Sequence, residues 1–97
     1  MASIRITPEE LRTTASDLET KREEILSAVG VIESRVNSTT AEWEGAAQSS
    51  FVASFEELLP TLKETFPEVI SGIAAQLKGA ADALEAADEE VSKAFKG

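Results

Sequence analysis

Trp43-Glu44-Gly45 separates two long stretches whose apolar residues have the spacing of α-helices. The triplet holds the only tryptophan of the 97-residue chain, and its glycine allows a backbone shape that a larger residue would strain. A large ring beside a glycine, at the one clear break near the middle of the chain, predicts a helical hairpin with a turn over residues 41–46. The expected helices cover about residues 8–40 and 47–95.

The first helix has a clear start. In Thr7-Pro8-Glu9-Glu10, Thr7 suits the capping position, Pro8 the first helical position, and Glu10 completes a capping box. Apolar residues then recur in two heptad rows, which predicts packing against a partner along the helix. One row holds Ala15, Val29 and Val36, interrupted by Arg22; the other holds Leu11, Leu18, Ile25 and Ile32. The polar residues 37–40 are weak helix formers ahead of the turn.

The second half repeats every eleven residues. Such a repeat corresponds to ~3.67 residues per turn, so that one helix face stays apolar over a long distance. The three series are Phe51, Leu62, Ile73, Leu84 and Phe95; Phe55, Phe66 and Leu77; and Leu58, Val69, Ala80 and Val91. The second series would continue at position 88, where a carboxylate, Asp88, stands in place of a hydrophobe.

Two prolines, Pro60 and Pro67, interrupt the second helix pattern, because proline removes a backbone hydrogen bond and crowds the preceding turn. The apolar register nevertheless continues through both. We therefore expect one long helix that is bent or locally loosened around residues 56–67. The alternative is a new helix start at Thr65-Phe66-Pro67-Glu68.

Composition excludes several functions. The chain contains neither cysteine nor histidine, so the usual nucleophile–base pairs cannot be built, and neighbouring acidic residues are typical of a solvated helix face. We expect no enzyme, no cofactor and no metal site. A net charge of −9 without a basic patch argues against nucleic acid and against anionic membranes. No apolar run is long enough for a membrane span or a cleaved signal, which by itself suggests a cytoplasmic protein.

A single hairpin would leave bulky side chains such as Phe51, Phe55 and Phe66 exposed on its flanks. Two hairpins docked face to face resolve this, so the expected architecture is all-α: an antiparallel hairpin that dimerises into an elongated four-helix bundle. The predicted core or dimer seam comprises Leu11, Leu18, Ile25, Val29, Ile32, Phe51, Phe55, Leu58, Leu62, Phe66, Val69, Ile73 and Leu77.

Trp43 and Gly45, in the turn of an acidic, cysteine-free hairpin of about one hundred residues, resemble the WXG family of small type VII secretion substrates, the group named for an early secreted antigenic target. The resemblance covers the whole chain. It implies a bacterial protein that dimerises with itself or with a related WXG-type chain and is exported without a cleaved signal by a membrane-bound ATPase. The expected localisation is then cytoplasmic before export and extracellular afterwards.

The same family carries a C-terminal export motif, hydrophobic-x-x-x-Asp/Glu-x-x-hydrophobic-x-x-x-hydrophobic. Leu84, Asp88, Val91 and Phe95 match it position for position. The resemblance implies that the three apolar residues anchor the tail in a groove of the ATPase and that Asp88 adds a polar contact. Leu84 stands where the better-known form has Tyr, which weakens recognition or leaves the stronger signal to a partner chain. Alternatively, the bundle ends before Asp88 and leaves it in water.

Three other functions remain open from the sequence: one half of an obligate heterodimer, a secreted protein that inserts an apolar stripe into membranes, and a plain intracellular coiled-coil adaptor. Expression of the chain alone separates the first from a homodimer. The acidic surface argues against stable membrane insertion at neutral pH.

Overall fold

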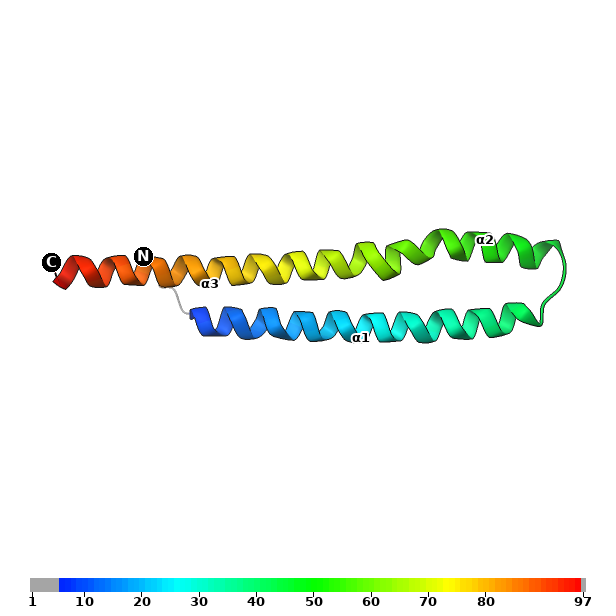
Figure 1. Cartoon of the computed structure of the whole chain (residues 1–97), viewed down its shortest axis with the longest axis horizontal. Coiled ribbons are helices and arrows are strands. Elements are labelled where there is room, and N and C mark those ends of the chain that lie inside the picture. Colours follow the sequence, from blue (N-terminus) through cyan, green and yellow to red (C-terminus); the bar gives the residue numbers. More distant parts are fainter. Residues whose placement is uncertain (1–5, 97) are drawn as a thin grey trace. The chain divides into compact units, whose positions relative to one another are not determined.

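The protein is an all-α helical hairpin, as the sequence predicts (Figure 1). The computed structural model describes the backbone of residues 6–96 and the side chains of residues 6–94. Within this part there are no strands, and the helical elements are α1 (Pro8–Ala41), α2 (Ala46–Pro60), the π-helical turn η1 (Thr61–Thr65) and α3 (Phe66–Lys96). None of the described helices is long and apolar enough to cross a membrane.

The capping box predicted at the start of α1 is confirmed. The backbone N–H of Glu10 donates to the hydroxyl of Thr7 at 3.1 Å, and the N–H of Thr7 donates to the Glu10 carboxylate at 3.4 Å. Two N–H groups that the first helical turn leaves without intrahelical partners are thereby satisfied. The helix start is therefore encoded locally, before any tertiary contact forms.

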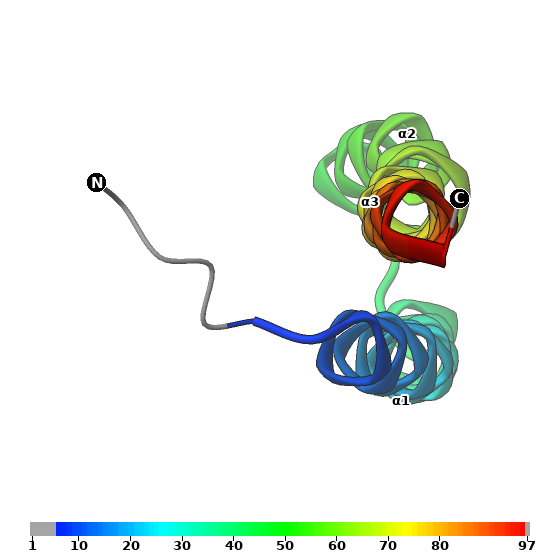
Figure 2. The ribbon, with the colours of Figure 1, turned by 90° about the vertical axis from the view of Figure 1, so that its left-hand side faces the viewer.

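The chain divides into two compact units. The first unit contains the chain up to Thr20 together with the chain from Ile70 onwards, and the start of α1 lies beside α3 (Figures 1 and 2). The second unit, Lys21–Val69, contains the rest of α1, the turn, α2, η1 and the first residues of α3. Each unit therefore pairs two antiparallel helical segments.

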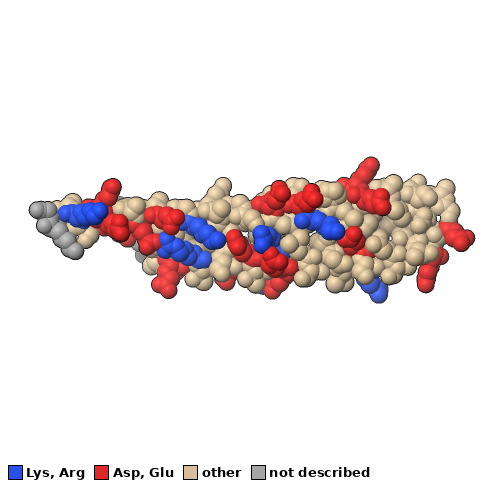
Figure 3. All heavy atoms as spheres, viewed as in Figure 1, with Lys and Arg blue, Asp and Glu red and all other residues tan. Residues whose placement is uncertain are grey.

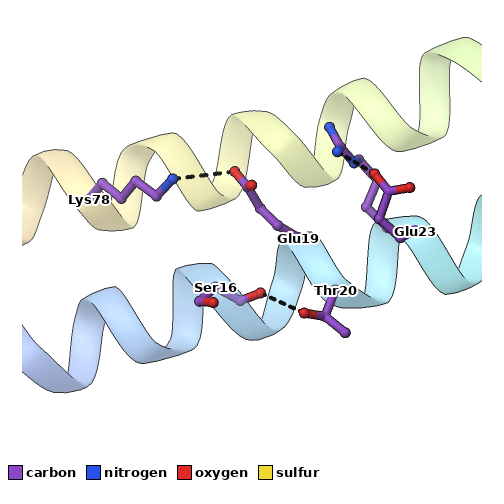
Figure 4. A network of polar contacts seen from close by, with 6 residues as sticks. Ser16, Glu19, Thr20, Glu23 and Lys78 are labelled. Carbon is purple, nitrogen blue, oxygen red and sulfur yellow. Dashed lines mark hydrogen bonds and ion pairs between the residues drawn. The ribbon is translucent and has the colours of Figure 1, made fainter.

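Ion pairs set the register of the helices in the first unit. Arg12 pairs with Glu85 and, at 2.7 Å, with Asp82. Lys78 pairs with Glu19 at 3.4 Å (Figure 4). Arg12 and Glu19 are one heptad apart on α1, and Glu85 and Lys78 are one heptad apart on α3, as antiparallel pairing requires. Hydrogen bonds to Asp82 and then Glu85 raise the pKa of Arg12, so the guanidinium stays charged.

The π-turn accommodates one extra residue in the second helix. In the second unit, Lys63 pairs with Glu33 at 2.8 Å. Glu19 and Glu33 are two heptads apart on α1, whereas Lys63 and Lys78 are separated by two heptads plus one residue. In η1 the N–H of Phe66 donates to the carbonyl of Thr61, five residues back, which fits that residue into the helix.

The two prolines flank this turn. Pro60 ends α2, and Pro67, the second residue of α3, has no N–H to donate. A proline ring in regular α geometry crowds the carbonyl four residues back, and a wider turn at that point relieves the crowding. The bend that the prolines predict between residues 56 and 67 therefore takes the form of η1, with no loop on either side.

Small side chains form the interface between the helices. In the first unit Ala15, Ala74 and Ala81 have no exposed surface, and in the second Val29 and Pro67 are buried. The ion pairs explain why Ala15 and Ala81 lie at about the same height. Ala15 follows Arg12 by three residues on α1. On the antiparallel α3, Asp82, the neighbour of Ala81, precedes Glu85, the partner of Arg12, by three. Short side chains at these heights let the two helices approach closely, but they bury little apolar area.

The large apolar residues are mostly on the outside. Of the thirteen seam residues expected from the sequence, Val29 is buried. Leu11, Leu18, Ile25, Phe55, Leu62 and Leu77 are half-buried, and Ile32, Phe51, Leu58, Phe66, Val69 and Ile73 are exposed. The predicted seam is therefore not the interior of one chain, because smaller residues occupy that place.

The two flanks of the helix pair differ in chemistry. Successive residues turn by about 100° around a helix. Relative to the buried Ala74, Lys78 therefore lies about 40° to one side and Ile73 about 100° to the other. The charged flank, part of which Figure 3 shows, consists of Arg12, Glu19, Lys78 and Glu85 in the first unit and of Glu33 and Lys63 in the second. The apolar flank consists of Leu11, Leu18, Ile73, Leu77 and Leu84 in the first unit and of Ile25, Ile32, Phe51, Phe55, Leu58, Leu62 and Phe66 in the second.

The small-residue interface can be tested by overpacking it. We expect Ala81→Leu to lower the free energy of unfolding by about 1–3 kcal/mol, because a larger side chain forces the helices apart. Ala83→Leu, two residues along α3 at an exposed position, should have little effect, since leucine forms helices nearly as well as alanine. Chemical denaturation followed by circular dichroism measures both, and equal losses would contradict this interface.

Candidate functional site: the tryptophan turn and the tail

Hydrogen bonds close the end of α1. The N–H groups of Glu42 and Trp43 donate to the carbonyls of Thr39 and Thr40, each at 3.2 Å. The buried hydroxyl of Thr40 donates to the Val36 carbonyl at 2.9 Å, so that this residue supports the helix end. The side chain of Gln48, on α2, donates to the Thr40 carbonyl at 3.1 Å. That bond gives the Thr40 carbonyl, which already accepts from Trp43, a second donor and ties α2 to α1.

Gly45 allows the chain to enter α2. It is the N-terminal capping residue of α2, with φ 114° and ψ 177°, a region that side chains with a Cβ strongly disfavour. A Cβ built at Gly45 would meet no atom within 4 Å. The requirement for glycine is therefore conformational and does not come from crowding. The carbonyl of Gly45 accepts from the N–H of Ser49 at 3.3 Å and so begins the helix.

Trp43 begins a row of aromatic rings. Its centroid lies 5.9 Å from that of Phe51 in a tilted arrangement, and Phe51 stacks on Phe55 at 6.2 Å. These distances are typical of favourable aromatic pairs. Trp43 is nevertheless 41% exposed and Phe51 42% exposed. The tryptophan therefore pins the turn on one side and presents an apolar surface on the other.

A hollow of about 310 Å³ lies beside Trp43. It is lined by Arg35, Val36, Thr39, Thr40, Trp43 and Phe51, all from the second unit. Arg35 is exposed, and among the basic side chains that the structure describes, Arg35 and Lys93 alone have no ion pair. The hollow thus combines an aromatic wall with a cation whose charge is free to meet an anion.

The tail belongs to the first unit. Leu84 is half-buried, while Asp88 is exposed and Val91 is 56% exposed. The backbone of Phe95 is part of α3, but its side chain lies outside the described residues. Leu84, Asp88 and Val91 are four and three residues apart and so share one helix face, with the carboxylate between two hydrophobes.

Sequence reasoning found the turn but missed Arg35, Thr40 and Gln48. Thr40 was interpreted only as a weak helix former. Gln48 had a usable signal, since it stands three residues after the capping glycine, where capping motifs place Gln or Glu. Arg35 had no such signal in the sequence, because its significance comes from the absence of an ion pair with a neighbouring acidic side chain. Within residues 6–94, no cluster of acidic side chains is suited to hold a metal ion.

Comparisons with known proteins agree with this geometry. Residues 3–89 match the family WXG100, described as proteins of 100 residues with WXG. The type VII secretion system extracellular protein A of Staphylococcus aureus (strain USA300) is 30% identical over 95 residues, which cover 98% of this chain and 97% of that protein. The ESAT-6-like protein SAG1039 of Streptococcus agalactiae is 30% identical over 97 residues and the full length of both chains.

Solved structures share the fold. EsxA of Geobacillus thermodenitrificans superposes with a TM-score of 0.74 at 26% identity, covering 93% of this chain and 97% of that one. The secreted protein EsxB of Bacillus anthracis gives a TM-score of 0.74 at 32% identity, with coverage of 91% and 99%. Both similarities extend over more than nine tenths of this chain.

Two glycine substitutions, one in the turn and one inside α1, should change the stability of the protein in opposite directions. We expect Gly45→Ala to cost about 1–3 kcal/mol of stability, because alanine disfavours the observed φ and ψ. Gly30→Ala lies inside α1 with no atom within 4 Å of its new Cβ, and should stabilise the protein by about 1 kcal/mol. Thermal unfolding measures both. A Gly45→Ala protein as stable as the wild type would contradict the conformational role of this glycine.

Proposed function

The chain belongs to the WXG100 family, and from this premise we propose that it is a secreted, non-catalytic substrate of a type VII secretion system that acts as a homodimeric four-helix bundle. The observation that carries the proposal is the apolar flank, which no other part of the described chain covers. A relative carries the name of a type VII secretion system extracellular protein, which supports the export step.

The apolar flank favours a second copy as its partner. Leu58 is 60% exposed, Phe66 48% and Ile73 46%. So many large apolar side chains on one side of a small chain are typical of an interface. Two flanks facing each other would bury these residues and leave both charged flanks in water, where ion pairs cost least. The negative charges of the two copies then stay on the outside of the bundle.

The tail is proposed as the export signal. Leu84, Val91 and Phe95 would act as apolar anchors in a groove of the secretion ATPase, and Asp88 would add the polar contact that gives specificity. The exposure of Asp88 and Val91 supports this, because a receptor needs an accessible helix face. In the dimer we place the tail of one copy close to the Trp43 turn of the other.

A heterodimer with a related WXG-type chain is the second candidate. It is favoured by Leu84, which stands where a tyrosine would give the stronger form of the export motif. In this version the partner carries the stronger signal and supplies the covering flank. A chain that is monomeric and poorly helical when expressed alone, and folds on addition of a related chain, would replace the homodimer by this candidate.

The export signal can be tested in a host that has a type VII secretion system. We expect Asp88→Ala to reduce the protein in the medium at least about tenfold while the amount in the cell is kept, because one polar contact to the receptor is lost. Glu90→Ala, two residues away on another face of α3, should be exported like the wild type. If wild-type protein never reaches the medium, or if Asp88→Ala is exported normally, the proposed signal is wrong.

A charged residue on the apolar flank tests the dimer. Ile73→Lys places a cation at a 46% exposed position on this flank, and we expect it to weaken the dimer at least about tenfold by burying an unpaired charge. Gln76→Lys is the matched control, since Gln76 is exposed and lies away from the flank. Sedimentation equilibrium measures both dissociation constants, and equal values would exclude this flank as the interface.

A further inference from the structure

We propose that Arg35 and the hollow beside Trp43 hold the tail of a second copy of this chain, with Arg35 paired to Asp88 of that copy and an apolar tail residue against the aromatic wall. This rests on the proposed dimer and adds to it a specific seat for the tail and a residue that determines it.

The first argument is the charge of Arg35. The ion pairs between the helices use Arg12, Lys63 and Lys78, so that these cations are already neutralised by this chain. Arg35 has no such partner. It directly precedes Val36, which belongs to the heptad row of Ala15 and Val29, and one residue turns its side chain by about 100° from Val36 towards the apolar flank. A second copy on this flank would desolvate the guanidinium. A buried unpaired charge is costly, so the covering surface has to supply a carboxylate.

The second argument is the chemistry of the hollow. Val36, Trp43 and Phe51 give it an apolar wall, and Arg35 stands at its edge. A complementary occupant has apolar groups on both sides of one carboxylate. The helix face of Leu84, Asp88 and Val91 has this pattern, and both Asp88 and Val91 are exposed.

The third argument is the side of the helix on which the tail residues lie. Relative to the buried Ala81, Leu84 and Val91 lie about 60–80° towards the apolar flank, whereas Asp88, one heptad after Ala81, lies only about 20° to that side, at the edge of the flank. A second copy that covers the apolar flank therefore meets these residues together. By contrast, Glu89 and Glu90 point to other sides of α3 and cannot share the seat.

The seat also gives the export signal two states. With Asp88 held by Arg35, the tail is ordered beside Trp43 and its carboxylate is occupied. A receptor that binds the tail must replace this contact with its own. Arg35 is thus a positioning residue for the tail and not part of the receptor contact.

The absence of cysteine from the chain permits a clean crosslinking test. One chain carries Thr39→Cys, in the wall of the hollow, and the other carries Ala87→Cys, next to Asp88 on the apolar side. A disulfide forms only when the two Cα atoms come within about 7 Å. We expect the mixed chains to give a disulfide-linked pair on mild oxidation. Ala86→Cys, one residue away and facing outwards, is the matched control and should crosslink far less.

Charge variants then test Arg35 itself. In the mixture of Thr39→Cys and Ala87→Cys chains, Arg35→Glu should lower the crosslink yield about tenfold by placing like charges together. The combination of Arg35→Glu with Asp88→Arg should restore it. Glu89→Arg in place of Asp88→Arg should not restore it.

Sedimentation of each mixture separates the two proposals. A dimer that crosslinks equally through positions 86 and 87, or whose yield ignores Arg35→Glu, overturns the tail seat and leaves the dimer intact. A chain that stays monomeric at the crosslinking concentration overturns both. A dimer whose yield falls with Arg35→Glu and recovers only with Asp88→Arg supports the seat.

Discussion

The structure depends on one packing constraint: the interface between the helices is made by alanines in the first unit and by Val29 and Pro67 in the second. Ala15, Ala74 and Ala81 are fully buried, and the phenylalanines, leucines and isoleucines among residues 6–94 are partly or largely exposed. Short side chains allow the two helices to approach closely and to keep the alignment set by the ion pairs. They bury too little apolar area, however, to account for a stable chain of this size. The missing burial has to come from a partner, and the apolar flank is where it is available. In the proposed dimer fold and assembly are linked, since the small interior of one chain is complemented by the interior formed between two copies.

The ion pairs and the π-turn show how register is kept along such a thin interface. Arg12, Glu19 and Glu33 follow strict heptads on α1, while their partners include one extra residue that η1 accommodates between Pro60 and Pro67. Each exposed pair adds little stability. Together they favour one alignment over neighbouring ones, because a shift by one residue would place Glu64 opposite Glu33. The prolines, which look like helix breakers in the sequence, stand where the helix needs a wider turn.

Much of this was accessible from the sequence. The Trp43–Gly45 break, the capping box at Thr7 and the apolar periodicity predict the hairpin, because all three are local signals. The identity of the interior was not predictable in the same way: bulky seam residues and alanines share the same periodicity, and only the inter-helix register shows which row faces inward. Arg35 and Gln48 were missed for a related reason. Their importance lies in an absent ion pair and in a bond across the turn, neither of which a single-helix pattern contains. The tail motif at Asp88 remains a prediction.

The dependence of wild-type thermal unfolding on protein concentration tests the central claim most directly. If a second copy supplies the missing burial, folding is coupled to association, and the midpoint Tm measured by circular dichroism rises steadily with concentration. Sedimentation under the same conditions should then give twice the 10.3 kDa mass of one chain. A fully helical protein whose Tm is the same at every concentration, and whose mass is that of one chain, would contradict the account, because the alanine interface would then be sufficient by itself.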